Sequence, residues 1–315
     1  MPGFGLSSRI VLAVDVPQAP SGRPRFRTGR AVPRSPQGTA VIELASDQLP
    51  PLARWFAAGS PGTAALADHV SASGTGRWWA DRVHAPRTLA VACAGHVLLR
   101  GDPSALAPDA LAVFDAHYVQ APRCFLPVLG SAFDRIVPWE RMLYLHQVPV
   151  AAPRPPRGVT VRRLVPADAP ALAALAPDTA WLHASWGGPA GLAASGLGWA
   201  AFGTDEILAV ACTYFHGTTY EDIACYTAPA HRRRRLALAC VTALCQDIAG
   251  RGHAPSWTCS RDNRPSRLLA WTAGFRLAHE YVHYLTGKPA RRDGGGPSGP
   301  PAATAALGDT PAPQH

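Results

Sequence analysis

Four consecutive arginines, Arg232 to Arg235, stand where a strand is expected to turn into a helix. The residues before them, Tyr220 to Tyr226, have the aromatic and β-branched character of a short strand. The residues after them, Leu236 to Ile248, place apolar side chains at the spacing of one helical face. The first turn of a helix offers unpaired N–H groups and a positive dipole end, so a phosphate group fits there. The sequence therefore predicts a phosphate-binding turn.

The order of segments beyond this helix is also informative. Gly250 to His253 leads into an apolar strand, Trp257-Thr258-Cys259, and then Asn263-Arg264-Pro265-Ser266 opens a second helix that stops at Ala273-Gly274-Phe275. With the phosphate turn, this order resembles the GNAT superfamily of N-acyltransferases, in its tandem, two-domain type. The family signature is Gln or Arg, two residues, Gly, one residue, then Gly or Ala. It aligns with Arg232–Ala237, and the resemblance covers roughly the last half of the chain.

The resemblance implies a fold and a donor site. The fold class is α/β (α+β): a GNAT fold in the C-terminal half, with a central mixed, splayed β-sheet flanked by helices, preceded by a degenerate GNAT-like N-terminal α/β domain. In that fold, the gap beside the strand before the phosphate turn holds the pantetheine arm of an acyl-CoA, acetyl-CoA by default. The donor-binding residues implied in this way are Cys225, Tyr226, Thr227, Arg232, Arg233, Arg234, Arg235, Leu236, Ala237, Asn263 and Ser266.

Two adjacent acids, Glu221 and Asp222, are the candidates for the base in acyl transfer to an amine. The amine must lose a proton, and a carboxylate near it is the usual base, directly or through water. Because neighbouring strand residues point to opposite faces, only one of the two can face the cleft. Asp222 aligns better with the family's acidic position, while Glu221 reaches further. Both could instead be ordinary surface acids.

Several other residues could take part in the chemistry, but each has a plainer explanation. The tyrosine acid of many family members corresponds here to Ala270, and Tyr226, Tyr281 or Tyr284 could replace it or serve only as strand aromatics. His231 could donate to the phosphate or simply cap the turn. Core packing accounts better than an acyl-cysteine for Cys259. Two histidines on one strand, His279 and His283, lack a third ligand, so we expect no metal.

Arg235 is the one departure from the signature, because the family has glycine there. Glycine lets the backbone approach the pyrophosphate of coenzyme A, and an arginine side chain must now fit nearby or swing out to solvent. The substitution leaves three hypotheses open. The first is an N-acyltransferase using acetyl-CoA, and the second uses an aminoacyl-tRNA as donor, in line with the arginine run and a basic N-terminal arm. The third is a non-catalytic ligand-binding protein.

We favour the first hypothesis, an acyltransferase acting on a small-molecule amine. The strand Trp257-x-Cys259 resembles a branch of the family that includes antibiotic-resistance acetyltransferases, which implies specialised metabolism or resistance. A tRNA partner stays open in the second hypothesis. Neither the acceptor nor the oligomeric state can be read from the sequence.

Composition bounds the setting of this chemistry. The chain has 315 residues, of which 47% are apolar, and a formal net charge of +9 that gathers in residues 1–38 and around the arginine run. A polyanionic donor would explain that placement. Lys288 is the only lysine, so biased composition also contributes. The seven cysteines show no metal-type spacing and predict a reducing, cytoplasmic setting. No apolar run approaches the about 20 residues of a membrane helix, so we expect no membrane association.

The distribution of proline, glycine and apolar residues predicts five segments. They are a disordered basic arm at 1–38, an N-terminal domain at 39–148, a proline-rich linker at 149–158, a C-terminal domain at 159–285 and a disordered tail at 286–315. The resemblance implies that the first domain is degenerate and GNAT-like and that the second is the catalytic GNAT domain. In the N-terminal domain we expect helices at 44–58, 64–71, 109–119 and 133–140, and strands at 87–93, 96–100, 124–129 and 141–148. In the C-terminal domain we expect strands at 159–165, 199–202, 207–215 and 279–285, a helix at 169–176 and a mobile substrate-side segment at 181–195.

Overall fold

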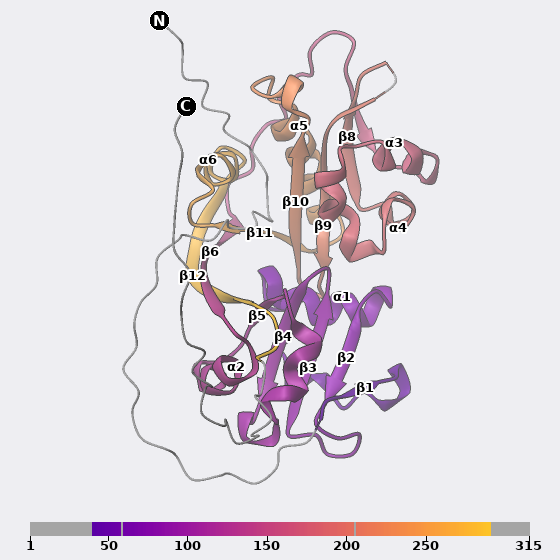
Figure 1. Cartoon of the computed structure of the whole chain (residues 1–315). Helices are drawn as coiled ribbons and strands as arrows, with labels where there is room; N and C mark the ends of the chain where they lie inside the picture. Colours follow the sequence, from indigo (N-terminus) through magenta and orange to yellow (C-terminus); the bar gives the residue numbers. More distant parts are fainter. Residues whose placement is uncertain (1–39, 58, 205, 291–315) are drawn as a thin grey trace, which may run out of the picture.

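Twelve strands of the chain form one mixed sheet in the computed structural model, which describes residues 40–57, 59–204 and 206–290. The strand order is β1-β2-β3-β4-β5-β12-β6-β11-β10-β9-β8-β7 (Figure 1). The predicted arm at 1–38 lies outside the described residues, as does most of the predicted tail. Residues 286–290 of that tail are described, and Pro289 forms a β-bridge with Phe133.

The sheet contains the same strand pattern twice. In the C-terminal half the strands are β7 (Thr160–Arg163), β8 (Gly198–Phe202), β9 (Ile207–His216), β10 (Tyr220–Thr227) and β11 (Ala254–Ser260). In the N-terminal half they are β1 (Ile42–Leu44), β2 (Arg77–Ala80), β3 (Thr88–Cys93), β4 (His96–Gly101) and β5 (Tyr118–Gln120). In each half the first four strands are antiparallel, and the fourth pairs in parallel with the fifth.

Two long strands join the halves. The strand β6 (Ile136–His146) pairs with β11 of the C-terminal half, and β12 (Phe275–Thr286) pairs with β5 of the N-terminal half. The two strands also pair with each other along nearly their whole length. Each half is therefore completed by a strand that the other half supplies. Strands from both sides of the predicted linker belong to one continuous sheet, so the sheet does not mark a domain boundary at 149–158, and that boundary stays a prediction.

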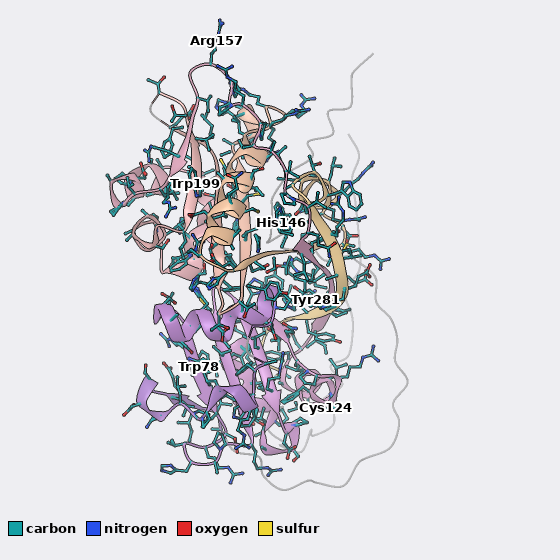
Figure 2. All side chains as sticks on the ribbon, turned by 180° about the vertical axis from the view of Figure 1, so that it is seen from behind. Trp78, Cys124, His146, Arg157, Trp199 and Tyr281 are labelled. Carbon is teal, nitrogen blue, oxygen red and sulfur yellow. The ribbon has the colours of Figure 1, made fainter. Side chains whose placement is uncertain are left out.

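Helices cover both faces of the sheet. On one face of the C-terminal half, α5 (Leu236–Gly250) and α6 (Arg264–Thr272) enclose a core that includes Ile223, Cys225 and Trp257. On the other face, α1 (Leu66–Ser73), α3 (Ala169–Ala173), α4 (Pro189–Ser195) and a 3-10 helix, Pro177–Trp186, enclose a second core. The helix α2 (Leu126–Ala132) packs on the N-terminal half with a 3-10 helix, Pro108–Phe114. Figure 2 shows Trp199 in the upper half, Trp78 in the lower half and Tyr281 between them.

The predicted elements of the C-terminal half and the first hairpin are confirmed, as is the helix at 64–71. Four predictions in the N-terminal half are wrong. The described residues of the predicted helix 44–58, which are 44–57, form the end of β1 and two 3-10 turns. Residues 109–119 form a 3-10 helix and the start of β5, residues 124–129 begin α2, and residues 133–140 begin β6. The segment 181–195 is helical, and its predicted mobility is untested.

Short apolar runs explain these errors. A run of five or six apolar residues fits a buried helix as well as a strand, and only distant partners decide between them. Pro127 at the first turn suits the start of α2, whereas β6 gains its ladder from strands more than a hundred residues later. Within the described part of the chain, no helix is both long and apolar enough to cross a membrane.

Gly274 gives a test of the junction where α6 ends and β12 begins. Its φ is +90°, and a β-carbon there would lie 1.9 Å from the carbonyl oxygen of Val148. We expect Gly274→Ala to lower the free energy of unfolding by about 2 kcal/mol or more, because both strain and a backbone clash must be relieved. Gly250 at the end of α5 is the control, since a β-carbon there meets nothing within 4 Å. Urea denaturation showing the same small effect for Gly274→Ala and Gly250→Ala would contradict the expectation.

Candidate active site

The parallel ladder between β10 and β11 covers only half of β10. Its register runs from Tyr220 opposite Ala254 to Ile223 opposite Trp257. Beyond this point β10 continues along β9 as far as Thr227, and β11 continues along β6. The ladder between β9 and β10 carries a β-bulge between Asp222 and Ile223. The sheet therefore opens next to Ile223, as expected for a splayed sheet.

The arginine turn begins where β10 ends. Pro229–His231 forms a single 3-10 turn, and Arg235 caps the N-terminus of α5 with φ of 58° and ψ of 17°. This left-handed conformation is the one that glycine adopts freely, and it costs other residues about 1–2 kcal/mol. Arg233 is also left-handed, with φ of 62°. The backbone thus keeps the shape that suits glycine, while the side chains of Arg233, Arg234 and Arg235 are exposed.

A groove of ≈ 680 Å³ lies between this turn and α6. Its lining is Val150, Ala151, Ala152, Pro153, Thr227, Arg232, Arg233, Arg235, Leu236, Ala237, Leu238, Pro265, Leu268, Leu269 and Thr272. Six of the predicted donor-binding residues are in this set. The walls are mostly apolar, with arginines at the end nearest the turn. The first-turn N–H groups of α5 have no acceptor within the helix, so they add a site for an anion.

One wall of the groove could not be found from the sequence. Residues 150–153 of the predicted linker line it, together with Leu268, Leu269 and Thr272 of α6. The proline content predicted a linker here, but nothing local shows that it runs beside α6. The α6 part of this wall is marked by Leu268, an apolar side chain that is 64% exposed on the outer face of the helix. This exposure is visible only in the structure.

Five predicted donor-binding residues lie outside the groove lining. Cys225 is fully buried in the core beneath α5, and burial raises the pKa of its thiol. Tyr226 lies on the opposite face, and the Arg234 guanidinium donates to Nδ1 of His231 at 3.0 Å. Asn263 caps α6 by accepting from the N–H of Ser266 at 3.0 Å, and Ser266 accepts from the indole N–H of Trp257 at 3.0 Å. The contact of all five residues with a donor stays a prediction. Asn263 and Ser266 anchor α6 through the hydrogen bonds just described.

Asp222 lies at the bulge, on the sheet face away from α5. Its side chain is 2% exposed and accepts hydrogen bonds from Ser256 at 3.1 Å and Thr258 at 2.9 Å. Burial raises the pKa of Asp222 to about 6, against the opposing effect of these hydrogen bonds and of the nearby Arg141 charge. A carboxylate with this pKa is ionised at neutral pH and still basic enough to take a proton, which suits a general base.

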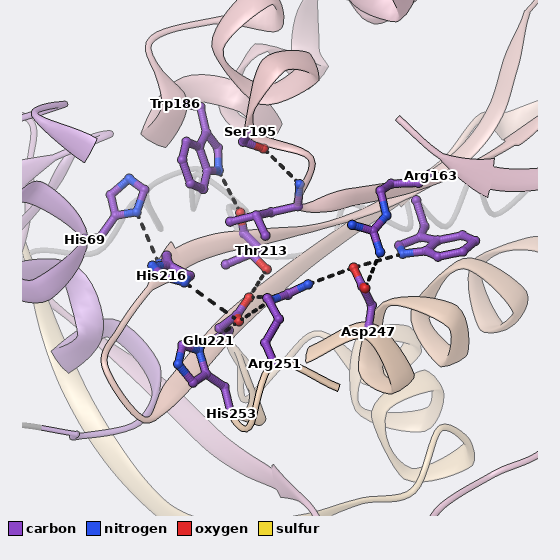
Figure 3. A network of polar contacts seen from close by, with 12 residues as sticks. His69, Arg163, Trp186, Ser195, Thr213, His216, Glu221, Asp247, Arg251 and His253 are labelled. Atoms are coloured by element: carbon purple, nitrogen blue, oxygen red, sulfur yellow. Dashed lines mark hydrogen bonds and ion pairs between the residues drawn. The ribbon is translucent and has the colours of Figure 1, made fainter. Parts of the chain in front are cut away.

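Glu221 faces the other way and is held by a network of polar contacts (Figure 3). Arg251 donates to both of its oxygens, at 3.0 and 2.8 Å, and Thr213 donates to one of them. Burial disfavours ionisation of Glu221, but the bonds from Arg251 and Thr213 outweigh it and hold the pKa below its usual value. Glu221 is held in an ion pair with Arg251, whereas the two bonds to Asp222 come from neutral hydroxyl groups, so the geometry favours Asp222 over Glu221 as the base.

Two histidines complete the network around Glu221. The Nδ1 atom of His253 lies 3.0 Å from a Glu221 oxygen, and the Nε2 atom of His216 lies 3.9 Å from it. The three groups lie within 4.8 Å of one another, close enough for a metal ion to bridge. Arg251 already balances the charge of the buried carboxylate, however, and itself pairs with Asp247 at 2.8 Å. We therefore describe the cluster as an ion-pair network that ties the end of α5 to β9, β10 and β11.

The remaining candidates lie in packed surroundings. Ala270 of α6 is fully buried in the same core as Cys259, and burial raises the pKa of the Cys259 thiol. His231 lies 3.4 Å from Glu206, beside the arginine turn. Burial lowers the pKa of His283 well below its usual value, while His279 on the same strand is exposed. None of these positions gains a geometry that suggests catalysis.

Comparisons with known proteins agree with this geometry. A family model described as GNAT acetyltransferase matches residues 153–284. An uncharacterized N-acetyltransferase from the mutA 5′ region of Streptomyces virginiae is 63% identical over 214 residues, which are 68% of this chain and 90% of that protein.

Two solved structures share the fold. A GCN5-related N-acetyltransferase-like protein from Streptococcus suis has a TM-score of 0.58 at 17% identity, over 76% of this chain and 99% of that one. A tandem GNAT protein from the clavulanic acid biosynthesis pathway has a TM-score of 0.51 at 13% identity, over 78% and 97% of the two chains. The second structure accords with the repeated strand pattern described above.

The network around Glu221 gives a prediction about stability and pH. We expect Glu221→Gln to lower the free energy of unfolding by about 3 kcal/mol at pH 7, because Arg251 loses its buried partner. A carboxyl whose folded pKa is lowered stabilises the protein above its ordinary pKa and loses that effect as the pH falls through the folded pKa. The difference from wild type should therefore be full above pH 4.5 and shrink in more acidic buffer.

The measurement is urea denaturation across this pH range. Glu280→Gln serves as the control, since Glu280 is exposed and lies 3.9 Å from Arg261, so its loss should cost less than about 1 kcal/mol. A cost for Glu221→Gln that is the same at pH 7 and at pH 3 would contradict the assignment.

Proposed function

This chain belongs to the GNAT acetyltransferase family, and from that premise we propose that it transfers an acetyl group from acetyl-CoA to an amine of a small molecule. The groove between the arginine turn and α6 carries this proposal. It joins a cluster of cationic side chains and helix N–H groups to Thr227 at the open edge of β10. A donor with an anionic end and a long, mainly uncharged arm matches a groove that is cationic at one end and mostly apolar along its length.

Each part of the groove would hold one part of acetyl-CoA. The pyrophosphate would bind the first-turn N–H groups of α5, with Arg232, Arg233 and Arg235 beside it. The pantetheine arm would pass between the leucines of α5 and α6 and pair with the free edge of β10, as an added strand does. The thioester would then lie near the bulge at Asp222 and Ile223.

The reaction needs a proton acceptor and an activated carbonyl, and acetyl-CoA supplies the carbonyl as a thioester. Asp222 takes the proton from the acceptor amine, directly or through a water molecule. The amine nitrogen then forms the bond to the acetyl carbon, the bond to sulfur breaks, and coenzyme A leaves as a thiolate that takes up a proton from water. Asp222 is held by two hydroxyl groups of β11, so its orientation is fixed before the acceptor arrives.

The cellular setting is a further part of the proposal. We expect a reducing cytoplasm, where acetyl-CoA is available, because all seven cysteines are free thiols and six of them are buried. A role in specialised metabolism or resistance is supported by the Trp257-x-Cys259 strand. The tandem GNAT protein of the clavulanic acid pathway shares only the fold, so it does not identify the acceptor.

An aminoacyl-tRNA donor is the second candidate function, favoured by one observation. Arg233, Arg234 and Arg235 are consecutive and all exposed, so they could contact a nucleic acid backbone outside the groove. The apolar lining of the groove favours coenzyme A instead. Membership in the family favours an enzyme over a non-catalytic ligand-binding protein.

The base gives the first functional prediction. We expect Asp222→Asn to lower kcat by about 10²–10⁴-fold, with little change in acetyl-CoA affinity, because the base acts on the acceptor amine. Steady-state kinetics with a panel of amines and calorimetric titration of acetyl-CoA measure the two quantities. Asp168→Asn is a matched control, since Asp168 is also buried and paired, with Arg162 at 2.7 Å, but lies away from the groove. Equal rates for the two variants would rule out Asp222 as the base.

Arg235 gives a second functional prediction that separates the two donors. Arg235→Gly should raise the free energy of unfolding by about 1 kcal/mol, because glycine relieves the left-handed backbone. Acetyl-CoA affinity should hold or improve, since the pyrophosphate gains room. Arg234→Ala is the control for charge, because Arg234 does not share the positive φ. If the donor is instead a tRNA, Arg235→Gly should weaken tRNA binding and flatten its salt dependence by at most about one unit of log–log slope.

A further inference from the structure

We propose that Arg141 of the N-terminal half is a positioning residue for the reaction, because it fixes Asp222 through Thr258 and supplies its buried counter-charge. The inference rests on the proposed function, in which Asp222 is the base. It assigns the N-terminal half a part in the chemistry of the C-terminal half, beyond a part in stability.

A short chain of hydrogen bonds connects the two residues. The Arg141 guanidinium donates to the hydroxyl of Thr258 at 3.3 Å, and that hydroxyl donates to Asp222 at 2.9 Å. On the other oxygen, Asp222 accepts from Ser256, whose hydroxyl in turn accepts from the backbone N–H of Gly62 at 2.9 Å. Both chains of hydrogen bonds thus begin at a donor in the N-terminal half and end on the Asp222 carboxylate in the C-terminal half.

The strand exchange brings Arg141 to this place. Arg141 lies on β6, where it is paired with Ser260 of β11 on one side and Tyr281 of β12 on the other. Figure 2 shows Tyr281 at the junction of the two halves. The strand β6 precedes the linker in the chain but lies between β11 and β12 in the sheet. Arg141 is therefore a residue of the N-terminal half that lies among strands of the C-terminal half.

The two charges interact in buried surroundings, and the Arg141 charge acts to lower the pKa of Asp222. Arg141 and Asp222 are each 2% exposed, and the Arg141 guanidinium lies 4.2 Å from the ring centre of Trp139. Charges in such surroundings are screened far less than at the surface. A buried carboxylate without a counter-charge would take up a proton and lose its function as a base.

The other titratable groups nearby do not share this role. Tyr214 of β9 and Tyr281 of β12 lie near Asp222 and Arg141, whereas Cys259 of β11 lies on the opposite face, and burial raises the pKa of all three. His96 of β4 and His283 of β12 lie near Arg141, and burial lowers the pKa of both. All five are uncharged at neutral pH, so among the described groups around Asp222, Arg141 is the charged one.

The test is the pH dependence of kcat/KM for the full-length enzyme, with acetyl-CoA and its best amine. Removing the charge in Arg141→Met should move the acidic limb of the profile to higher pH by about one unit or more. Arg141→Lys should restore the limb to within a few tenths of a unit. Thr258→Val, which removes only the connecting hydroxyl, should move it in the same direction by less. These two variants keep the test available if Arg141→Met folds poorly.

Arg251→Met is the matched control, since it removes an arginine from the neighbouring carboxylate, Glu221, on the other face of the sheet. It should lower stability and leave the acidic limb in place. A merely structural Arg141 would behave in the same way, with a lower rate at every pH and an unmoved limb, and that result would overturn the inference.

A second measurement separates the inference from the function on which it rests. The Asp222 carboxyl can be titrated by ¹³C NMR in wild type and Arg141→Met, without any turnover. If its pKa rises in the variant together with the limb, the inference stands. If the pKa rises and the limb does not move, Asp222 is not the base and the proposed function fails at that point. If the pKa does not rise, Arg141 does not tune Asp222.

Discussion

The backbone hydrogen bonds between β10 and β11 stop at Ile223 and Trp257, and the rest of the site depends on this early end of the ladder. Every backbone N–H and C=O removed from water needs a partner, so an opened strand edge must find one elsewhere. Between Ala224 and Thr227, β10 has β9 on one side and the open edge on the other. The groove, the arginine turn and the bulge at Asp222 are arranged around that edge.

The exchange of β6 and β12 is the second organising feature. Opening a sheet in its middle weakens it, and the long antiparallel pair of β6 and β12 holds the strands beyond the opening. The same pair carries Arg141 to Thr258 and hence to Asp222. One arrangement therefore supports the sheet where it opens and places a cation beside the carboxylate. In this chain the two similar halves thus share a single sheet, while the family model matches only residues 153–284.

The sequence predicted the parts of this arrangement that depend on local pattern. The strand at Tyr220–Tyr226, the turn at Arg232–Arg235 and the following helix are specified by neighbouring residues and were correct. Arg235 adopts the left-handed conformation that suits the family's glycine at this position. The conformational preference of arginine by itself would have argued against it. What could not be predicted depends on distant contacts. Residues 133–140 become a strand through partners far along the chain. Glu221 and Asp222 differ through partners on other elements, which include Arg251 for Glu221 and Thr258 for Asp222.

The account makes one central claim, that a donor bound in the groove presents its thioester to Asp222 at the opening of the sheet. A crystal structure of the full chain with acetyl-CoA tests it most directly. The account predicts the pyrophosphate on the N–H groups at the start of α5, the arm paired with Ala224 to Thr227 of β10, and the thioester beside the bulge at Asp222. Coenzyme A bound elsewhere, or a thioester on the Glu221 face of the sheet, would contradict it.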